Sequence, residues 1–141
     1  MCIRDRAQAI EVLSPALRYE LGSVNPGFNL IPAYLRGLAY LELKQGSSAA
    51  AEFQKINDHP GVVGNSVVTV LAHLGLARAY ALGGDTAKSR TAYQDFFALW
   101  KDADSDIPIL QQAKSESVSY THLDVYKRQP FFAAPKSTPW A

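Results

Sequence analysis

The stretch RGLAYLELKQG, residues 36–46, decides the fold because a related stretch follows it forty positions later. The pair Ala39-Tyr40 returns at the equivalent place in LGLARAYALGG, residues 74–84. Both stretches are rich in Ala and Leu and both end in glycine, which favours a helix that stops at a tight turn. Self-similarity at a fixed period predicts stacked copies of one structural unit.

A second rhythm covers the residues that follow each stretch. A small residue is followed four positions on by a larger or apolar residue and three positions later by another apolar one, which places all three on one helix face. The pattern occurs as Ala9, Leu13 and Ala16; as Ala49, Phe53 and Ile56; and as Ser89, Tyr93 and Phe96. Each unit is therefore predicted to be a helix, a short turn at QG (45–46) or GGD (83–85), and a second helix. We expect glycine to supply positive φ at each turn, and Ser47 and Asp85 to cap the helices that follow.

The chain is predicted to be all-α, with no strand before Val118. Pro15 lies inside the first predicted helix and should kink or shorten it, because proline removes a helical hydrogen bond. The segments NPG (25–27) and DHPGVVGN (58–65) are typical of loops. The predicted helices are Ala7–Glu20, Ile31–Lys44, Ser48–Asn57, Ser66–Leu82, Thr86–Lys101 and Ile107–Ser117.

In their spacing, these positions resemble the tetratricopeptide repeat (TPR). The matching residues are Gly37, Ala39, Tyr40, Ala49, Phe53 and Ile56 in the first copy, and Ala77, Tyr80, Gly84, Ser89 and Tyr93 in the second. The family unit has about 34 residues, so each copy here would carry a longer loop after its second helix. The family's usual Trp near the start of the first helix is absent. The resemblance covers about Ala7–Ser117 and implies a TPR-like α-solenoid of antiparallel helix pairs, about six helices in all.

The resemblance implies a non-catalytic protein–protein interaction module that binds a peptide or helix in its concave groove. The stretch from AAAEFQKI (49–56) to DIPIL (106–110) also resembles the C-terminal TPR region of large bacterial proteins that carry a serine/threonine kinase or winged-helix domain. The alternative is therefore a regulatory or sensory segment of such a multidomain protein. A small helical enzyme is a third reading, but the sequence has no nucleophile–base constellation, phosphate loop or kinase motif. We expect neither catalysis nor a cofactor.

Two end segments resemble translated adapter DNA. The codons GAT GTG TAT AAG AGA CAG encode DVYKRQ (124–129), and the same DNA read one base later encodes Met-Cys-Ile-Arg-Asp, the start of MCIRDR (1–6). The reverse complement encodes VSYTHL (118–123). This DNA is similar to the transposase recognition end used in tagmentation sequencing libraries. The alternative is an unrelated protein that matches an inverted DNA repeat at both places.

We therefore expect three parts in the chain: residues 1–6 from an adapter, residues 7–117 as a TPR-like domain fragment, and residues 118–141 as adapter and foreign tail that packs poorly. The whole chain carries a net charge of +1, and without the net +1 of residues 1–6 and the net +2 of residues 118–141 the domain carries −2. Such a domain has no basic excess for nucleic acid and no apolar run that could span a membrane. A protein or peptide partner, or another domain of the same parent chain, and a cytoplasmic location are predicted.

Three acidic residues alternate in DADSD (102–106), as at the start of a calcium loop. The Gly and Glu that such a loop needs at its sixth and twelfth positions are missing, so we expect a solvated linker in which Asp106 caps the final helix. His73 has apolar helical neighbours and no second ligand, which predicts a packed or groove-lining side chain rather than a metal ligand. His59 lies in a Pro-Gly turn and is expected to be exposed. No metal site is predicted.

The predicted binding surface is the concave groove that stacked helix pairs leave along their first helices. By analogy with the family, its candidate residues are Tyr34, Leu38, Leu41 and Glu42 in the first copy, and Leu74, Arg78, Ala81 and Leu82 in the second. For Leu38 and Leu74 the alternative is packing in the core. The paired Lys and Asn with which the family clamps a peptide carboxylate are absent, so an apolar or mixed helix or peptide is the expected ligand. The first predicted helix has no helix before it, so its face around Val12 and Leu13 should be partly exposed and permit self-association.

Overall fold

The computed structural model of the protein describes residues 3–22, 29–64 and 66–128, with side chains described only between residues 5 and 119. All regular structure in these residues is helical, which confirms the all-α prediction for this part of the chain. The elements are α1 (Ile3–Leu13), the 3-10 helix η1 (Ser14–Arg18), α2 (Ile31–Glu42), α3 (Gly46–Asp58), α4 (Pro60–Val63), α5 (Val67–Leu82), α6 (Thr86–Leu99) and α7 (Pro108–Arg128).

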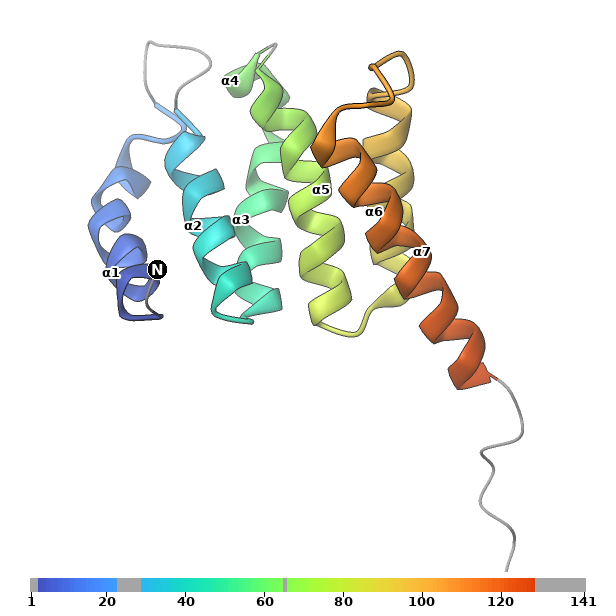
Figure 1. Ribbon diagram of the computed structural model, residues 1–141. Coiled ribbons are helices and arrows are strands. Elements are labelled where there is room, and N and C mark those ends of the chain that lie inside the picture. The colour runs from blue at the N-terminus through green and yellow to red at the C-terminus, as the bar shows by residue number, and fades with distance from the viewer. Residues whose placement is uncertain (1–2, 23–28, 65, 129–141) are drawn as a thin grey trace, which may run out of the picture.

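The long helices follow one another across the molecule from α1 to α7, a sequence called the row below, with α7 crossing in front of α6 (Figure 1). Helices α2 and α5 also pack directly on each other. Helix α3 packs on both α2 and α5, α5 packs on α6, α1 packs on α2, and α7 packs mainly on α6. Three residues separate α2 from α3 and three separate α5 from α6, so the chain reverses sharply at both places. The apolar faces of the helices are thus buried between neighbours along the row.

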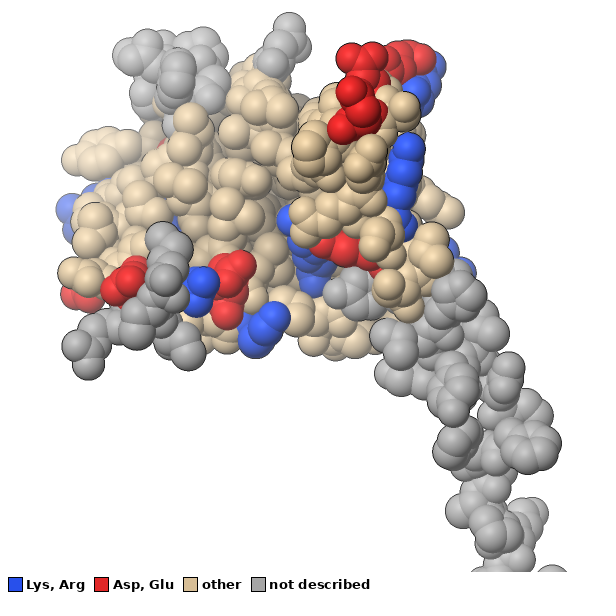
Figure 2. Space-filling model, in the orientation of Figure 1, with Lys and Arg blue, Asp and Glu red and all other residues tan. Residues whose placement is uncertain are grey.

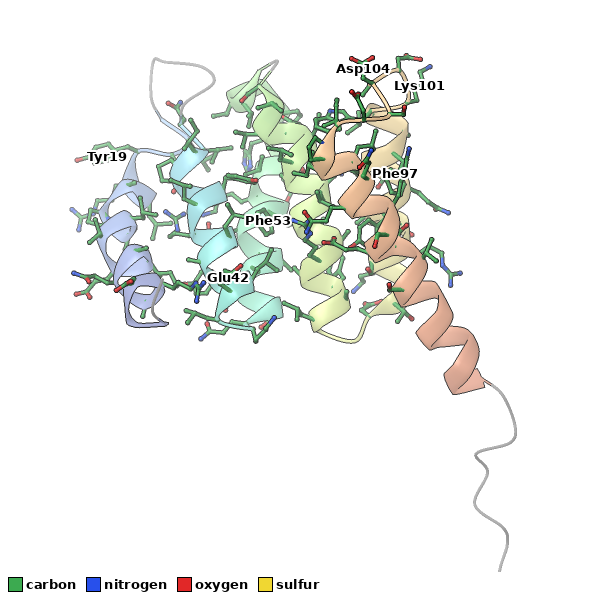
Figure 3. All side chains as sticks on the ribbon, in the orientation of Figure 1. Tyr19, Glu42, Phe53, Phe97, Lys101 and Asp104 are labelled. Atoms are coloured by element: carbon green, nitrogen blue, oxygen red, sulfur yellow. The ribbon has the colours of Figure 1, made fainter. Side chains whose placement is uncertain are left out.

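The ring of Phe53 lies at the centre of the core, where α2, α3 and α5 meet (Figure 3). Its side chain is fully buried. Two glycines lie against the ring: a Cβ at Gly37 of α2 would be 2.7 Å from Phe53 Cζ, and a Cβ at Gly75 of α5 would be 2.5 Å from the same atom. Tyr34 contacts the ring edge-on, with centroids 5.9 Å apart. The glycines therefore give this large side chain the room that any other residue would take away.

Each of the two sharp turns contains a residue with a positive φ, but the residue type differs between them. At the second turn Gly84 takes a φ of +78°, as predicted for glycine. At the first turn Lys44, the residue forty positions earlier, takes a φ of +60°, so the prediction that glycine would do so there is wrong. Gly46 instead lies inside α3, where an added Cβ would come within 2.7 Å of the Ala79 carbonyl oxygen. Gly46 is needed for the close approach of α3 to the end of α5.

Asp85 is one of the two predicted helix caps, and the structure confirms it. Its side chain accepts a hydrogen bond from the backbone N–H of Lys88 at 3.1 Å, at the start of α6. The predicted Ser47 cap is wrong because α3 begins at Gly46, two residues before the predicted start at Ser48, and has no side-chain cap. The predicted Asp106 cap is also wrong: Asp106 is exposed, and Ile107 is the residue that precedes α7.

Three further boundaries differ from the predicted ones. The first helix begins earlier and ends at Leu13, where Pro15 opens a 3-10 turn, so the expected shortening is confirmed. The predicted loop at 58–65 contains α4, which begins at Pro60 and buries Val63. The last helix passes Ser117 and continues to Arg128, because no Gly or Pro interrupts the chain between them.

A buried cluster of charged side chains fixes η1 and the turn after it to the row. Arg36 of α2, 1% exposed, donates two hydrogen bonds to Glu52 of α3, at 3.0 and 2.8 Å, and one to the Leu13 carbonyl oxygen at 3.2 Å. Arg36 also forms a 2.6 Å ion pair with Glu20, which is 2% exposed, and Lys55 contacts both glutamates. Burial by itself would lower the pKa of Arg36, but its hydrogen bonds to Glu52 and Glu20 outweigh that effect and raise it.

The α1 end of the row exposes apolar side chains. Val12 and Tyr19 are each 70% exposed, and Leu17 and Leu21 are exposed as well. Figure 3 shows Tyr19 at the outer edge, directed away from the other helices. The predicted exposure of Val12 is confirmed, whereas self-association through this end stays a prediction.

Candidate binding groove

A groove of about 700 Å³ opens on the face of the row formed by α1, α2, α5 and α7. Its apolar part consists of two alanines and five leucines: Ala9, Ala39, Leu13, Leu35, Leu38, Leu41 and Leu82. Leu35 is 44% and Leu82 41% exposed. Leucines exposed together in a concave surface are typical of a ligand-binding groove, because their burial by a ligand is favourable.

Five of the eight predicted groove residues line this cavity: Leu38, Leu41, Glu42, Arg78 and Leu82. The other three do not. Tyr34 is half-buried against Phe53, and burial raises the pKa of its hydroxyl although the charge of Arg78 acts in the opposite direction. Ala81 lies outside the cavity. Leu74 is 1% exposed and belongs to the core, so its placement in the groove is corrected.

Charged side chains lie around the leucines in two ion pairs. On one side, Arg6 of α1 contacts Glu42 of α2 at 2.9 Å. On the other, Arg78 of α5 contacts Glu116 of α7. Figure 2 shows blue and red groups next to each other in the lower part of this face, with uncharged surface above and between them. The groove thus combines an apolar floor with a mostly paired, polar rim.

The Arg78–Glu116 pair is the more elaborate of the two. The guanidinium donates from Nε to Glu116 Oε2 at 2.8 Å and from Nη2 to Oε1 at 3.1 Å. The Tyr93 hydroxyl donates to Oε2 at 3.1 Å, and Gln112 Nε2 donates to Oε1 at 2.8 Å. A carboxylate with four donors is held in one orientation. Side chains of α5, α6 and α7 therefore meet at one residue.

Sequence reasoning missed several residues of the groove, among them Leu35, Lys44, Gln112 and Glu116. The first two lie in or next to the stretch 36–46, three residues from Leu38 and Leu41 respectively, so helical spacing from the predicted groove residues is a usable signal for them. No signal of this kind exists for Glu116, because its helix has no counterpart in the repeat pattern and its position depends on packing against α6.

A second, smaller cavity of about 280 Å³ lies between α6 and α7. It is lined by Phe97, Trp100, Lys101, Ala103, Ser105, Leu110 and Lys114. The three aspartates of DADSD, next to it, are exposed, and Asp102 contacts Lys101 at 4.0 Å. None of the predicted groove residues lines this cavity.

The two described histidines, His73 and His59, are partly buried by neighbouring residues and are not grouped as metal ligands. His73 of α5 is half-buried, and burial lowers the pKa of its imidazole although the charge of Asp95 on α6 acts against this. His73 does not line the groove. His59 is half-buried rather than exposed, with Nδ1 2.8 Å from the Lys55 carbonyl oxygen. Within the described residues, no cluster of three His, Cys, Asp or Glu side chains is placed to hold a metal ion.

No helix in the described part of the chain has the length and apolar character that a membrane span requires. No protein family model matches the sequence, and neither the curated proteins nor the solved structures contain a significantly similar chain.

Proposed function

We propose that residues 7–117 form a non-catalytic protein–protein interaction module, a fragment of a TPR-like α-solenoid that binds a peptide or helix in the groove. The observation that carries this proposal is the 700 Å³ groove with its exposed leucines. An apolar groove of this kind fits the apolar stripe of an amphipathic helix, which presents side chains at i, i+3, i+4 and i+7.

The burial of equivalent positions supports the repeat part of the proposal. Positions forty residues apart have the same environment in the two helix pairs: Ala49 and Ser89, Phe53 and Tyr93, and Ile56 and Phe96 are all buried. Ser89 keeps the small size of its counterpart and donates its hydroxyl to the Ala77 carbonyl oxygen at 2.9 Å. The same contact scheme in successive pairs is what a repeat architecture requires.

Two leucines allow a matched test of groove binding. Leu82 ends α5 and lines the groove, whereas Leu99 ends α6, is 53% exposed and lies outside it. The probe is a fluorescein-labelled helical peptide with a leucine stripe and otherwise Ala and Gln, and fluorescence anisotropy gives its Kd. We expect Leu82→Glu to raise the Kd by about tenfold or more, because a charge replaces a central apolar contact.

The control variant Leu99→Glu should change the Kd by less than about twofold, since its contribution to binding is that of a surface residue outside the interface. Circular dichroism checks that both variants stay helical. Equal weakening by both substitutions, or no binding by the wild-type protein, would contradict the proposed function.

A further inference from the structure

We propose that Arg78 is the anchor for a carboxylate carried by the groove's partner, and that Glu116 of α7 occupies this anchor until the partner displaces it. The inference rests on the proposed function and specifies the partner's chemistry: an amphipathic segment with a leucine stripe and an acidic side chain next to it. Glu116 is then an internal competitor, and α7 responds to ligand binding.

The geometry of Arg78 suits an exchange of carboxylates. Its guanidinium lines the groove and already holds a carboxylate in the two-point arrangement that Arg and carboxylates favour. Its Nη1 makes no hydrogen bond with any described residue, so it is open to a second acceptor. An incoming carboxylate can bind Nη1 first and take over Nε and Nη2 as Glu116 leaves.

The Arg78–Glu116 contact is partly exposed, and its replacement requires Glu116 to give up the hydrogen bonds from Tyr93 and Gln112 as well as those from Arg78. Both side chains are 24% exposed, so water can solvate each charge during the exchange. A contact of this exposure contributes modestly to stability. Helix α7 packs mainly on α6, where Leu110 and Ala113 are its buried residues, and Val118 just beyond Glu116 is 55% exposed. The helix can therefore loosen at Glu116 while its first turns stay packed.

The charges that line the groove favour an acidic partner. Three are acidic (Asp5, Glu42 and Glu116) and three are basic (Arg6, Lys44 and Arg78), so the lining is neutral while Glu116 is in place. Lys44 has no ion-pair partner among the described residues, whereas Arg6 is paired with Glu42. Removal of Glu116 gives the lining a net positive charge, which a carboxylate next to a leucine stripe complements.

Two peptides test the inference: the neutral leucine-stripe probe described above, and the same peptide with one Gln next to the stripe replaced by Glu. Anisotropy gives the Kd of each for the full chain and for Glu116→Gln. The Gln side chain is uncharged and competes less well than Glu116 for Arg78. We therefore expect Glu116→Gln to lower the Kd of the acidic peptide roughly fivefold and that of the neutral peptide by less than about twofold. Glu11→Gln, an exposed glutamate outside the groove, is the matched control and should change neither.

The variant Arg78→Gln tests the anchor directly. It should abolish the preference for the acidic peptide, so that the two peptides bind Arg78→Gln with Kd values within about twofold of each other, since both carry the same leucine stripe. Amide hydrogen exchange distinguishes displacement of Glu116 from simple charge attraction, which would leave α7 unchanged. The acidic peptide should speed amide exchange at residues 114–118 of wild-type α7, and the neutral peptide should not.

The outcomes separate the inference from the proposed function. If both peptides bind with equal affinity to wild type and to Glu116→Gln, or exchange in α7 does not respond to the acidic peptide, the carboxylate anchor is overturned while groove binding stands. If neither peptide binds any of these proteins, the proposed function fails, and the inference fails with it.

Discussion

Arg36 and Arg78 make the same kind of contact in two parts of the row but differ in burial. Each donates two hydrogen bonds from its guanidinium to a glutamate on another helix. Arg36 is 1% exposed, whereas Arg78 is 24% exposed and faces the groove. The forty-residue alignment places Leu76 opposite Arg36 and Leu38 opposite Arg78, so each arginine stands where the other helix pair has leucine. The forty-residue repeat pattern therefore does not call for an arginine at either position.

The difference in burial separates a fixed contact from an exchangeable one. A charge buried with its partners cannot lose one of them without leaving the others unpaired in a low-dielectric surrounding. Arg36, Glu20 and Glu52 are in that situation, and together they hold η1 and its following turn on α2 and α3. A partly exposed pair can separate more easily because water reaches both charges. Arg78 and Glu116 are in this second situation.

The largest loss of folding stability is expected when the buried side chain of Arg36 is truncated. Arg36→Ala should lower the free energy of unfolding by about 3–5 kcal/mol, because Glu20 and Glu52 stay buried without their main partner. Arg78→Ala should lower it less, by about 1–2 kcal/mol, because the two hydrogen bonds to Glu116 are lost but both side chains are partly exposed. Urea denaturation followed by circular dichroism measures both. Equal losses in the two variants would show that burial does not distinguish the contacts.

A smaller effect is expected at the glycines around Phe53, which belong to the fixed part of the molecule. Gly75→Ala should destabilise by about 1–3 kcal/mol, because its Cβ would overlap the buried Phe53 ring, which Gly37 also contacts. Gly61→Ala in α4, where nothing lies within 4 Å of the added Cβ, is the control and should not destabilise. Thermal unfolding measures both, and Phe53→Leu should partly rescue Gly75→Ala. Failure of that rescue would point to a different cause.

The smallest loss of folding stability is expected at the exposed contact between Asp85 and Lys88, which lies outside both arginine clusters. The backbone N–H and then the side chain of Lys88 hold the pKa of Asp85 below its ordinary value of 3.8. A lowered pKa in the folded state means that the ionised cap stabilises the protein above that ordinary value and that this stabilisation is lost as the pH falls through the folded-state pKa. Asp85→Ala should thus lower Tm at neutral pH, with a difference from wild type that shrinks in acid.

Asp106→Ala is the control for the helix cap, because Asp106 is exposed and lies outside the cap of α7. Its Tm should equal that of wild type across the same pH range. A Tm loss for Asp106→Ala as large as for Asp85→Ala would restore the cap that the sequence predicts and the structure does not contain.

The centre of the fold could be predicted because its signals are local and repeated. Phe53 and Tyr93 recur at a fixed interval, on helix faces whose apolar spacing is visible in the sequence. The turns before α3 and α6 were located for the same reason. Within the candidate groove, Leu38, Leu41, Glu42, Arg78 and Leu82 followed from the repeat register together with the analogy to the TPR family.

What could not be predicted depends on contacts between segments distant in the sequence. The partners of Arg36 lie on both sides of it, and Glu20 follows a 3-10 turn that has no periodic signal. Leu74 and Leu82 share one helix and similar chemistry, so only their packing distinguishes core from groove. The end of α7 was missed because the predicted boundary at Ser117 rested on the adapter resemblance, whereas residues 118–128 contain no Gly or Pro that would end the helix there.

The left-handed backbone conformation of Lys44 bears on how the first turn evolves. A residue with a Cβ loses roughly 1 kcal/mol or more in this conformation, and the equivalent Gly84 avoids that loss. Glycine at position 44 would relax the turn but remove a cation from the rim of the groove. Backbone strain that is retained although glycine would remove it is typical of a functional position. Selection for folding stability and selection for ligand binding would therefore act in opposite directions at this one residue.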